Sequence, residues 1–137
     1  DTFGLSYREF DVDGRVWLTP TVTPVQFEPE PLKDSVRRLL GFAPVAMYLT
    51  HFGRVGDVAR LGDLALAQID AMVVLARRCA GAQSERHARL RRALERFYLD
   101  GLRAHGCRLD AGRVLELLEM DIELNAQGLA IWLDRAG

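Results

Sequence analysis

Proline divides this chain into two stretches that must fold differently. All five prolines lie before residue 56, and the 137-residue sequence has none beyond it. Proline fixes its own φ angle, lacks an amide hydrogen and biases the preceding residue toward extended backbone. The early stretch is therefore limited to short strands, turns and a brief helix. The later stretch, rich in alanine, leucine and arginine, is free to form long helices.

A hairpin is predicted near the beginning of the chain. Asp13-Gly14 lies between two half-apolar runs at residues 6–11 and 15–19. An Asp-Gly pair in this position is a strong hairpin pattern, because both residues tolerate the positive φ angles of a tight turn. The prolines that follow keep the next residues extended.

One helix and one further strand are predicted in the rest of the early stretch. Pro31 suits the first turn of a helix, and Gly41 is placed to end it. Apolar residues recur at helical spacing between them, at Leu32, Val36, Leu39 and Leu40. The apolar run at residues 44–49 has the length of a strand and leads directly into residues 50–53.

Three amphipathic helices are predicted beyond residue 56, because apolar residues recur there every three or four positions. The first should run from about residue 57 to 79, with a break near residues 81–83. Ser84 and Asp110 are suited to be the N-caps of the other two helices, and Gly106 is suited to end the second. The core residues of these helices should include Leu61, Ala65, Ile69, Met72, Val73 and Ala76, then Leu90, Leu94, Phe97, Tyr98 and Leu102, then Val114, Leu118, Ile122, Asn125, Leu129 and Trp132.

Composition excludes several classes of partner. The net charge is −1, so there is no electrostatic reason to expect nucleic acid or an anionic membrane. The longest apolar run is shorter than the ~18 residues of a membrane span. Cys79 and Cys107 form no Cys-x-x-Cys pair, which favours reduced thiols in a cytoplasmic protein. His87, His105 and the arginine clusters at 77–78 and 89–92 are expected to be solvated on helix faces.

Three early segments resemble motifs of one enzyme family. Residues 1–8, Asp-Thr-Phe-Gly-Leu-Ser-Tyr-Arg, resemble the segment with the bridging aspartate in metallo-β-lactamase-fold hydrolases. Residues 20–27, Pro-Thr-Val-Thr-Pro-Val-Gln-Phe, are similar to the loop that follows in a bacterial branch of that family. Residues 49–53, Leu-Thr-His-Phe-Gly, resemble its last metal-binding motif, a histidine at the end of an apolar strand. Order and separation also match over roughly residues 1–55.

The resemblance implies a dinuclear metal site. Asp1 would be the bridging ligand and His51 a terminal ligand on the second metal. A carboxylate can bridge two divalent cations, and an imidazole suits zinc or iron. Two metals ~3.5–4 Å apart can generate a hydroxide and stabilise a developing oxyanion. Zinc is the first expectation, with iron or manganese as alternatives. Tyr7 and Arg8 follow the aspartate closely and are candidates either for substrate contacts or for a strand surface.

The chain also departs from the family pattern. The principal His-x-His-x-Asp-His motif and the histidine between the two matched motifs are absent. A catalytic zinc normally has about three protein ligands. We therefore expect a C-terminal piece of a longer hydrolase, binding metal weakly and inactive alone. The parent would cleave a small ester, lactone or thioester.

The fold class that follows is α+β. Residues 1–55 would be the last strands and one helix of an αββα sandwich, and residues 56–137 a three-helix C-terminal unit. Without the other half of the sandwich, an apolar face of residues 1–55 should be uncovered. Its members would be Phe3, Leu5, Val45, Met47 and Leu49. The expected partners are the N-terminal half of the parent, a small-molecule substrate and a second copy of the chain as a homodimer.

Two other functions fit the same residues. Residues 56–137 could be a helical dimerisation or partner-binding module without catalysis. They could also be substrate-binding helices of a thioesterase like glyoxalase II, in which a helical extension helps to bind a glutathione thioester. No residue in 56–137 specifies such a pocket.

Overall fold

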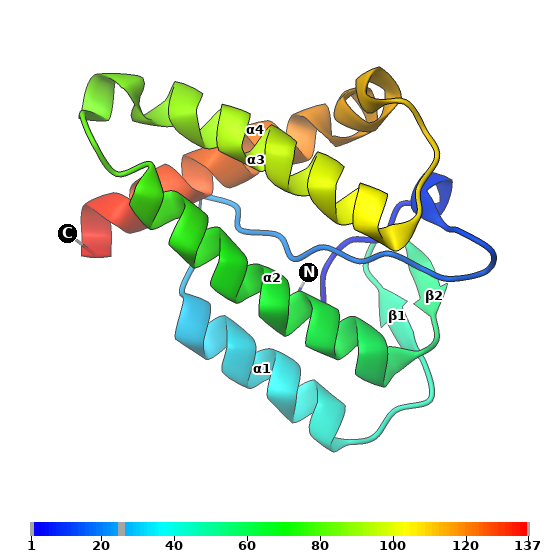
Figure 1. The fold of residues 1–137 in the computed structure, drawn as a ribbon. Helices are drawn as coiled ribbons and strands as arrows, with labels where there is room; N and C mark the ends of the chain where they lie inside the picture. Colours follow the sequence, from blue (N-terminus) through cyan, green and yellow to red (C-terminus); the bar gives the residue numbers. More distant parts are fainter. Residues whose placement is uncertain (1, 25–26, 137) are drawn as a thin grey trace. The chain divides into compact units, whose positions relative to one another are not determined.

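The computed structural model, which describes residues 2–24 and 27–136, has an α+β fold that is mostly helical (Figure 1). Its elements are a 3-10 helix η1 (Arg8–Phe10), the helices α1 (Pro29–Gly41), α2 (Val58–Arg78), α3 (Gln83–His105) and α4 (Ala111–Ala136), and the strands β1 (Met47–Leu49) and β2 (Gly53–Val55). The two strands form an antiparallel sheet. The α+β fold class predicted from the sequence is confirmed.

The chain divides into two compact units. The first consists of residues 1–21 and 28–71, and the second of residues 22–27 and 72–137. Helix α2 therefore runs through both units, and the short segment 22–27 belongs with the helices of the second unit. The predicted boundary near residue 56 is of a different kind, because it separates a piece of a sandwich domain from a helical domain of a parent protein. That boundary stays a prediction.

The predicted N-terminal hairpin is present at its turn and at its base. Asp13 and Gly14 have φ angles of 51° and 78°, as a tight hairpin turn requires. Leu5 and Thr19 exchange two backbone hydrogen bonds of 2.8 and 3.0 Å. Between them the first run does not form the predicted strand, because η1 interrupts it. The 3-10 turn directs Phe10 inward, where its side chain is completely buried.

The helix predicted in the early stretch is present, and the strand after it is shorter than predicted. Helix α1 begins at Pro29, which puts Pro31 in its first turn, and it ends at Gly41, both as predicted. The predicted strand at residues 44–49 is wrong in its first half, since β1 begins only at Met47. Val45 is 88% exposed and lies before the strand.

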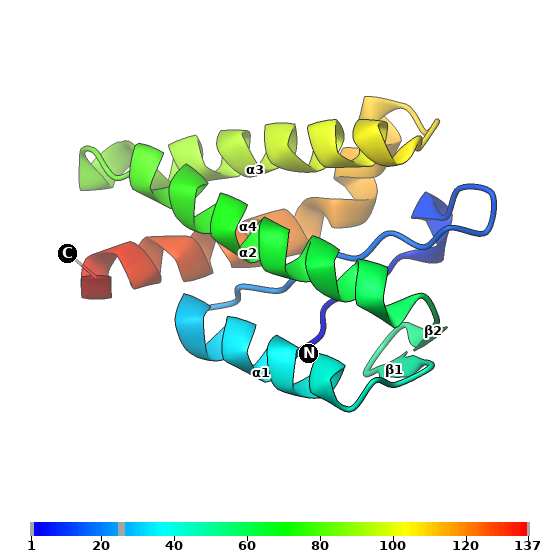
Figure 2. The same cartoon turned by 60° about the horizontal axis from the view of Figure 1, so that its bottom comes forward.

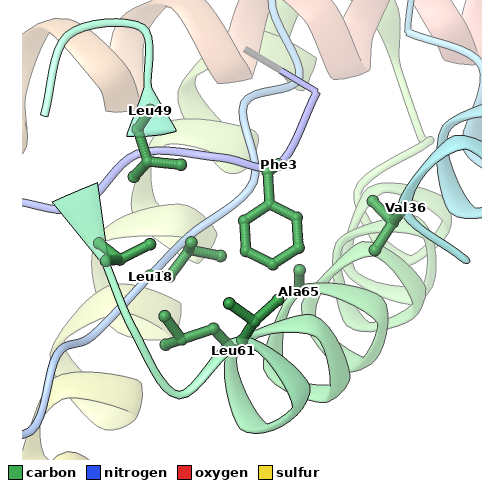
Figure 3. Close-up of a cluster of buried hydrophobic side chains, with 8 residues drawn as sticks. Phe3, Leu18, Val36, Leu49, Leu61 and Ala65 are labelled. Carbon is green, nitrogen blue, oxygen red and sulfur yellow. The ribbon is translucent and has the colours of Figure 1, made fainter. Parts of the chain in front are cut away.

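The core of the first unit joins the N-terminal segment to the long helix. Figure 3 shows Phe3, Leu18 and Leu49 directed toward Leu61 and Ala65 of α2. On the other side of this cluster, Val36 of α1 is also completely buried. Figures 1 and 2 show α1 running beside α2, and a side chain at Gly62 would collide with Leu40, so these two helices are in close contact.

This core corrects the expectation of an uncovered apolar face on residues 1–55. Phe3, Leu5 and Leu49 are only 4%, 7% and 8% exposed, and Met47 is half-buried. Of the five residues predicted to be uncovered, Val45 alone is exposed to solvent. The reason is that the first turns of α2 supply the cover that the prediction assigned to a missing half of the fold.

The second unit is built on the pair α3 and α4. The predicted core residues of these helices are buried, except Phe97 and Trp132, which are half-buried, as is Val73 of α2. Asn125 of α4 is buried, and both the nitrogen and the oxygen of its side-chain amide form hydrogen bonds. Its Nδ2 donates to the hydroxyl of Tyr98 at 2.7 Å, and its Oδ1 accepts from the backbone N–H of Val22 at 3.0 Å. The Asn125 amide thereby holds Val22 against α4.

The ends of α3 differ from each other in how well the sequence predicted them. Gly106 ends the helix with a φ of 96°, as predicted. Ser84 is not the N-cap, because α3 begins at Gln83 and Ala82 occupies that position without a side-chain hydrogen bond. Arg89, predicted to be solvated, instead donates to the carbonyls of Ala82 and Cys79 at 2.9 and 3.2 Å. These bonds fix the loop and the helix start in place of a cap.

The predicted cap of α4 is confirmed and gives a stability test. The Asp110 carboxylate accepts a 2.8 Å hydrogen bond from the N–H of Arg113. Asp110→Ala should lower the free energy of unfolding by about 1 kcal/mol. Ser84→Ala, the matched control, removes no capping bond and should change it by less than about 0.5 kcal/mol. Urea denaturation of both variants measures the difference, and equal effects would refute the assigned cap.

Among the helices of residues 2–24 and 27–136, none is long and apolar enough to cross a bilayer.

Candidate functional site

His51, a predicted metal ligand, lies in the turn that joins β1 to β2. Leu49 pairs with Gly53, which leaves residues 50–52 as the connection. We call these residues the His51 turn. Gly53 has a φ of 74°, a conformation that favours glycine, and this lets the short strands reverse direction. The His51 side chain is exposed to solvent at the end of β1.

Arg8, predicted as a candidate substrate contact, hydrogen-bonds the backbone around this turn. Its Nη2 donates to the carbonyl of Phe52 at 3.2 Å and to the carbonyl of Arg54 at 2.7 Å. Its Nη1 lies 3.8 Å from the carboxylate of Asp11. The Arg8 side chain is 52% exposed, so this ion pair contributes little by itself. The segment at residues 1–8 and the segment at residues 49–53 are therefore in direct contact.

A series of aromatic rings leads from the core of the first unit to His51. The rings of Trp17 and Phe10 are 5.6 Å apart, Phe10 and Tyr7 5.7 Å, and Tyr7 and Phe52 4.9 Å. The imidazole of His51 lies 6.4 Å from the Phe52 ring, nearly perpendicular to it. Each pair has the edge-to-face geometry that aromatic rings prefer. Tyr7 is thus a half-buried packing residue beside the His51 turn.

Asp1, the other predicted metal ligand, lies outside the described residues. Residues 2–24 and 27–136 contain no group of at least three His, Cys, Asp or Glu side chains that could hold a metal ion. The described part of the chain therefore does not fit a metal centre by itself, since His51 is one donor and a catalytic metal needs several.

The remaining histidines have structural partners. His105, predicted to be solvated, is buried, and it extends the buried face of α3 three residues beyond Leu102. His87, also predicted to be solvated, is half-buried, with its Nε2 3.0 Å from Glu123 of α4. Arg91, from one of the predicted solvated clusters, donates to the same Glu123 and to Glu119.

The ionisable groups with shifted pKa values also have structural roles. The carboxylates of Asp70 and Glu30 raise the pKa of Lys33, which keeps this nearly buried ammonium charged. Burial raises the pKa of the Cys79 thiol, so Cys79 is a poor nucleophile. Gln127 and Arg91 lower the pKa of Glu123. These shifts identify no acid–base pair near His51.

A shallow hollow of about 280 Å³ lies in the first unit. The described residues that line it are Thr2, Ser35, Arg38, Leu39 and Phe42. Among these lining residues only Arg38 is charged, none carries a carboxylate, imidazole or thiol, and none is a predicted site residue. The candidate site therefore remains the His51 turn.

Two residues that interact with Arg8 were not singled out from the sequence. Phe52 contacts both Tyr7 and Arg8, and Asp11 faces the Arg8 guanidinium. The three-residue spacing of Arg8 and Asp11 could have indicated their ion pair. No local pattern indicated the contact with Phe52, because it joins residues 44 positions apart.

Comparison of the chain with protein-family models, with curated proteins and with solved structures gives no match.

Proposed function

We propose that this chain is the C-terminal piece of a metal-dependent hydrolase of the metallo-β-lactamase-fold superfamily. The observation that supports this most is the contact between Arg8 and the carbonyls of Phe52 and Arg54. It joins the segment that resembles the bridging-aspartate motif to the segment that resembles the last-histidine motif. In such an enzyme both motifs serve one site, so they have to lie together.

The exposed position of His51 also fits this proposal. A terminal metal ligand has to present a ring nitrogen at the protein surface or in a cleft, and His51 lies at the tip of a hairpin with its side chain in solvent. The parent would supply the remaining ligands and cleave a small ester, lactone or thioester in the cytoplasm. Bound there, two zinc ions, or iron or manganese, would supply the attacking hydroxide.

The chain by itself is proposed to be inactive. Even with Asp1 included, it offers two recognised ligands, and metal affinity depends on ligand number and geometry together. Calorimetry that detects a stoichiometric, sub-micromolar zinc site on the 137-residue chain would show that further ligands exist in it.

The decisive experiment uses the full-length parent. His51→Ala should lower hydrolysis of responsive ester, lactone or thioester substrates at least about 100-fold, because loss of an outer partner of a metal ligand already costs 10- to 100-fold. The bound metal, measured by elemental analysis, should fall as well. His87→Ala is the matched control, since His87 pairs with Glu123 on a helix surface. Equal metal content and activity in both variants would refute the role of His51.

The same experiment separates the alternatives. A parent without a His-x-His-x-Asp-His segment and without bound metal would favour a helical dimerisation or partner-binding module. A parent that binds metal and prefers thioesters would favour the glyoxalase II-like branch, with substrate-binding helices.

A further inference from the structure

We propose that Arg8 is a positioning residue for His51 and does not contact the substrate. The inference rests on the proposed function for what His51 does. The geometry is independent of that function, because the structure itself joins Arg8 to the backbone on both sides of Gly53. The His51 turn ends at Phe52, whose carbonyl is one of the two that the guanidinium holds.

The guanidinium hydrogens near the turn are already used. A terminal guanidinium nitrogen has two hydrogens, and those of Nη2 serve the carbonyls of Phe52 and Arg54. Nη1 is directed toward Asp11. A substrate carboxylate or carbonyl could bind Nη2 only by displacing the two backbone carbonyls. Hydrogen bonds from a charged donor are stronger than neutral ones, so that exchange is unfavourable.

Tyr7 holds the same turn through a different contact. Its ring lies 4.9 Å from the ring of Phe52, and 5.7 Å from the completely buried ring of Phe10. Adjacent residues 7 and 8 thus hold one residue, Phe52, by its ring and by its carbonyl. Phe52 is the covalent neighbour of His51. Its contacts with the buried residues therefore restrict the positions that the imidazole can take.

The hairpin needs this support because it is small. β1 and β2 have three residues each, and an isolated two-stranded hairpin is marginally stable at best in water. Turns of this kind fray unless tertiary contacts hold them. A histidine on a fraying turn would sample many positions, which a reacting geometry does not tolerate.

Amide exchange on the 137-residue chain tests the inference without any metal or substrate. Arg8→Ala should accelerate exchange of the amides at residues 49–55 about tenfold, as the loss of charge-assisted hydrogen bonds predicts. Amides of α3 and α4 should keep their rates. Arg37→Ala is the matched control, because the Arg37 side chain is 53% exposed and pairs only locally with Asp34. Arg8→Lys should give an intermediate rate.

Unchanged exchange at residues 49–55, or an equal rise throughout the chain, would overturn the inference. In the full-length parent, Arg8→Ala should lower kcat about tenfold to a hundredfold with KM changed less than about twofold. A rise in KM with kcat unchanged would mean that Arg8 contacts substrate and would also overturn it. If the wild-type parent has no hydrolase activity, the proposed function fails, while the exchange result still decides whether Arg8 holds the turn.

Discussion

Gly128→Ala is expected to destabilise the protein, although alanine is the better helix former. Gly128 lies inside α4, and a Cβ atom there would collide with the backbone carbonyl of Val22 and lie 2.8 Å from the carbonyl carbon of Thr23. These are backbone atoms, which cannot rotate away as a flexible side chain would. Overpacking of a buried site typically costs about 1–3 kcal/mol. Separation of the two backbones would also strain the hydrogen bond between Val22 and Asn125.

Gly101→Ala is the matched control for this substitution. Gly101 lies inside α3, and an added Cβ would meet no atom within 4 Å. Alanine there should stabilise the protein by about 0.5–1 kcal/mol, since it removes the conformational freedom of glycine from the unfolded chain. Opposite signs for the two Gly→Ala variants in urea denaturation would support the close approach at Gly128. Stabilisation by both would mean that Val22 and Thr23 do not lie on α4.

Phe3→Ala should have the second large effect, a loss of about 3–5 kcal/mol, which is typical of a buried phenylalanine. Phe3 is 4% exposed in the cluster with Leu61 and Ala65 of α2. Were Phe3 on an uncovered face, as the sequence suggested, its removal would leave stability unchanged and improve solubility. The variant therefore distinguishes a core that this chain closes itself from one that needs another half.

Phe42→Ala is the matched control. It makes the same phenylalanine-to-alanine change at an exposed position, so it separates the effect of burial from that of the substitution itself. Phe42 is 81% exposed at the end of α1, so its loss should change the free energy of unfolding by less than about 0.5 kcal/mol. Thermal unfolding monitored by circular dichroism suffices to compare the two variants. Similar midpoints for Phe3→Ala and Phe42→Ala would contradict the core of the first unit.

The sequence predicted the long helices well because their evidence is local. A stripe such as Leu90, Leu94 and Leu102 repeats often enough to define one buried face, and Gly106 and Asp110 act through atoms of their own turns. The same spacing extends to His105, and the prediction of a solvated imidazole failed there because residue type was given more weight than position.

What the sequence could not predict depends on long-range packing. Ser84 has the side chain of an N-cap, but α3 already begins at Gln83, and Arg89 binds the carbonyl of Ala82 before it. Phe3 and Leu49 were assigned to an uncovered face, because nothing in their neighbourhood shows that α2 covers them. Of the candidate site, His51 could be singled out by its motif, whereas its link to Arg8 joins residues that no local pattern relates.

Segment 22–27 has a consequence for how this polypeptide can be made and cut. It belongs to the second unit, while the residues before and after it belong to the first. The amide of Val22 finds its partner in Asn125, 103 residues later. On a ribosome, the first unit could close before the second unit exists, but the Val22 amide would have no partner in α4 until almost the whole chain had emerged. No single cleavage therefore separates the chain into two complete folding units, and a helical piece expressed alone would lack the backbone of Val22 and Thr23 that α4 accommodates at Gly128.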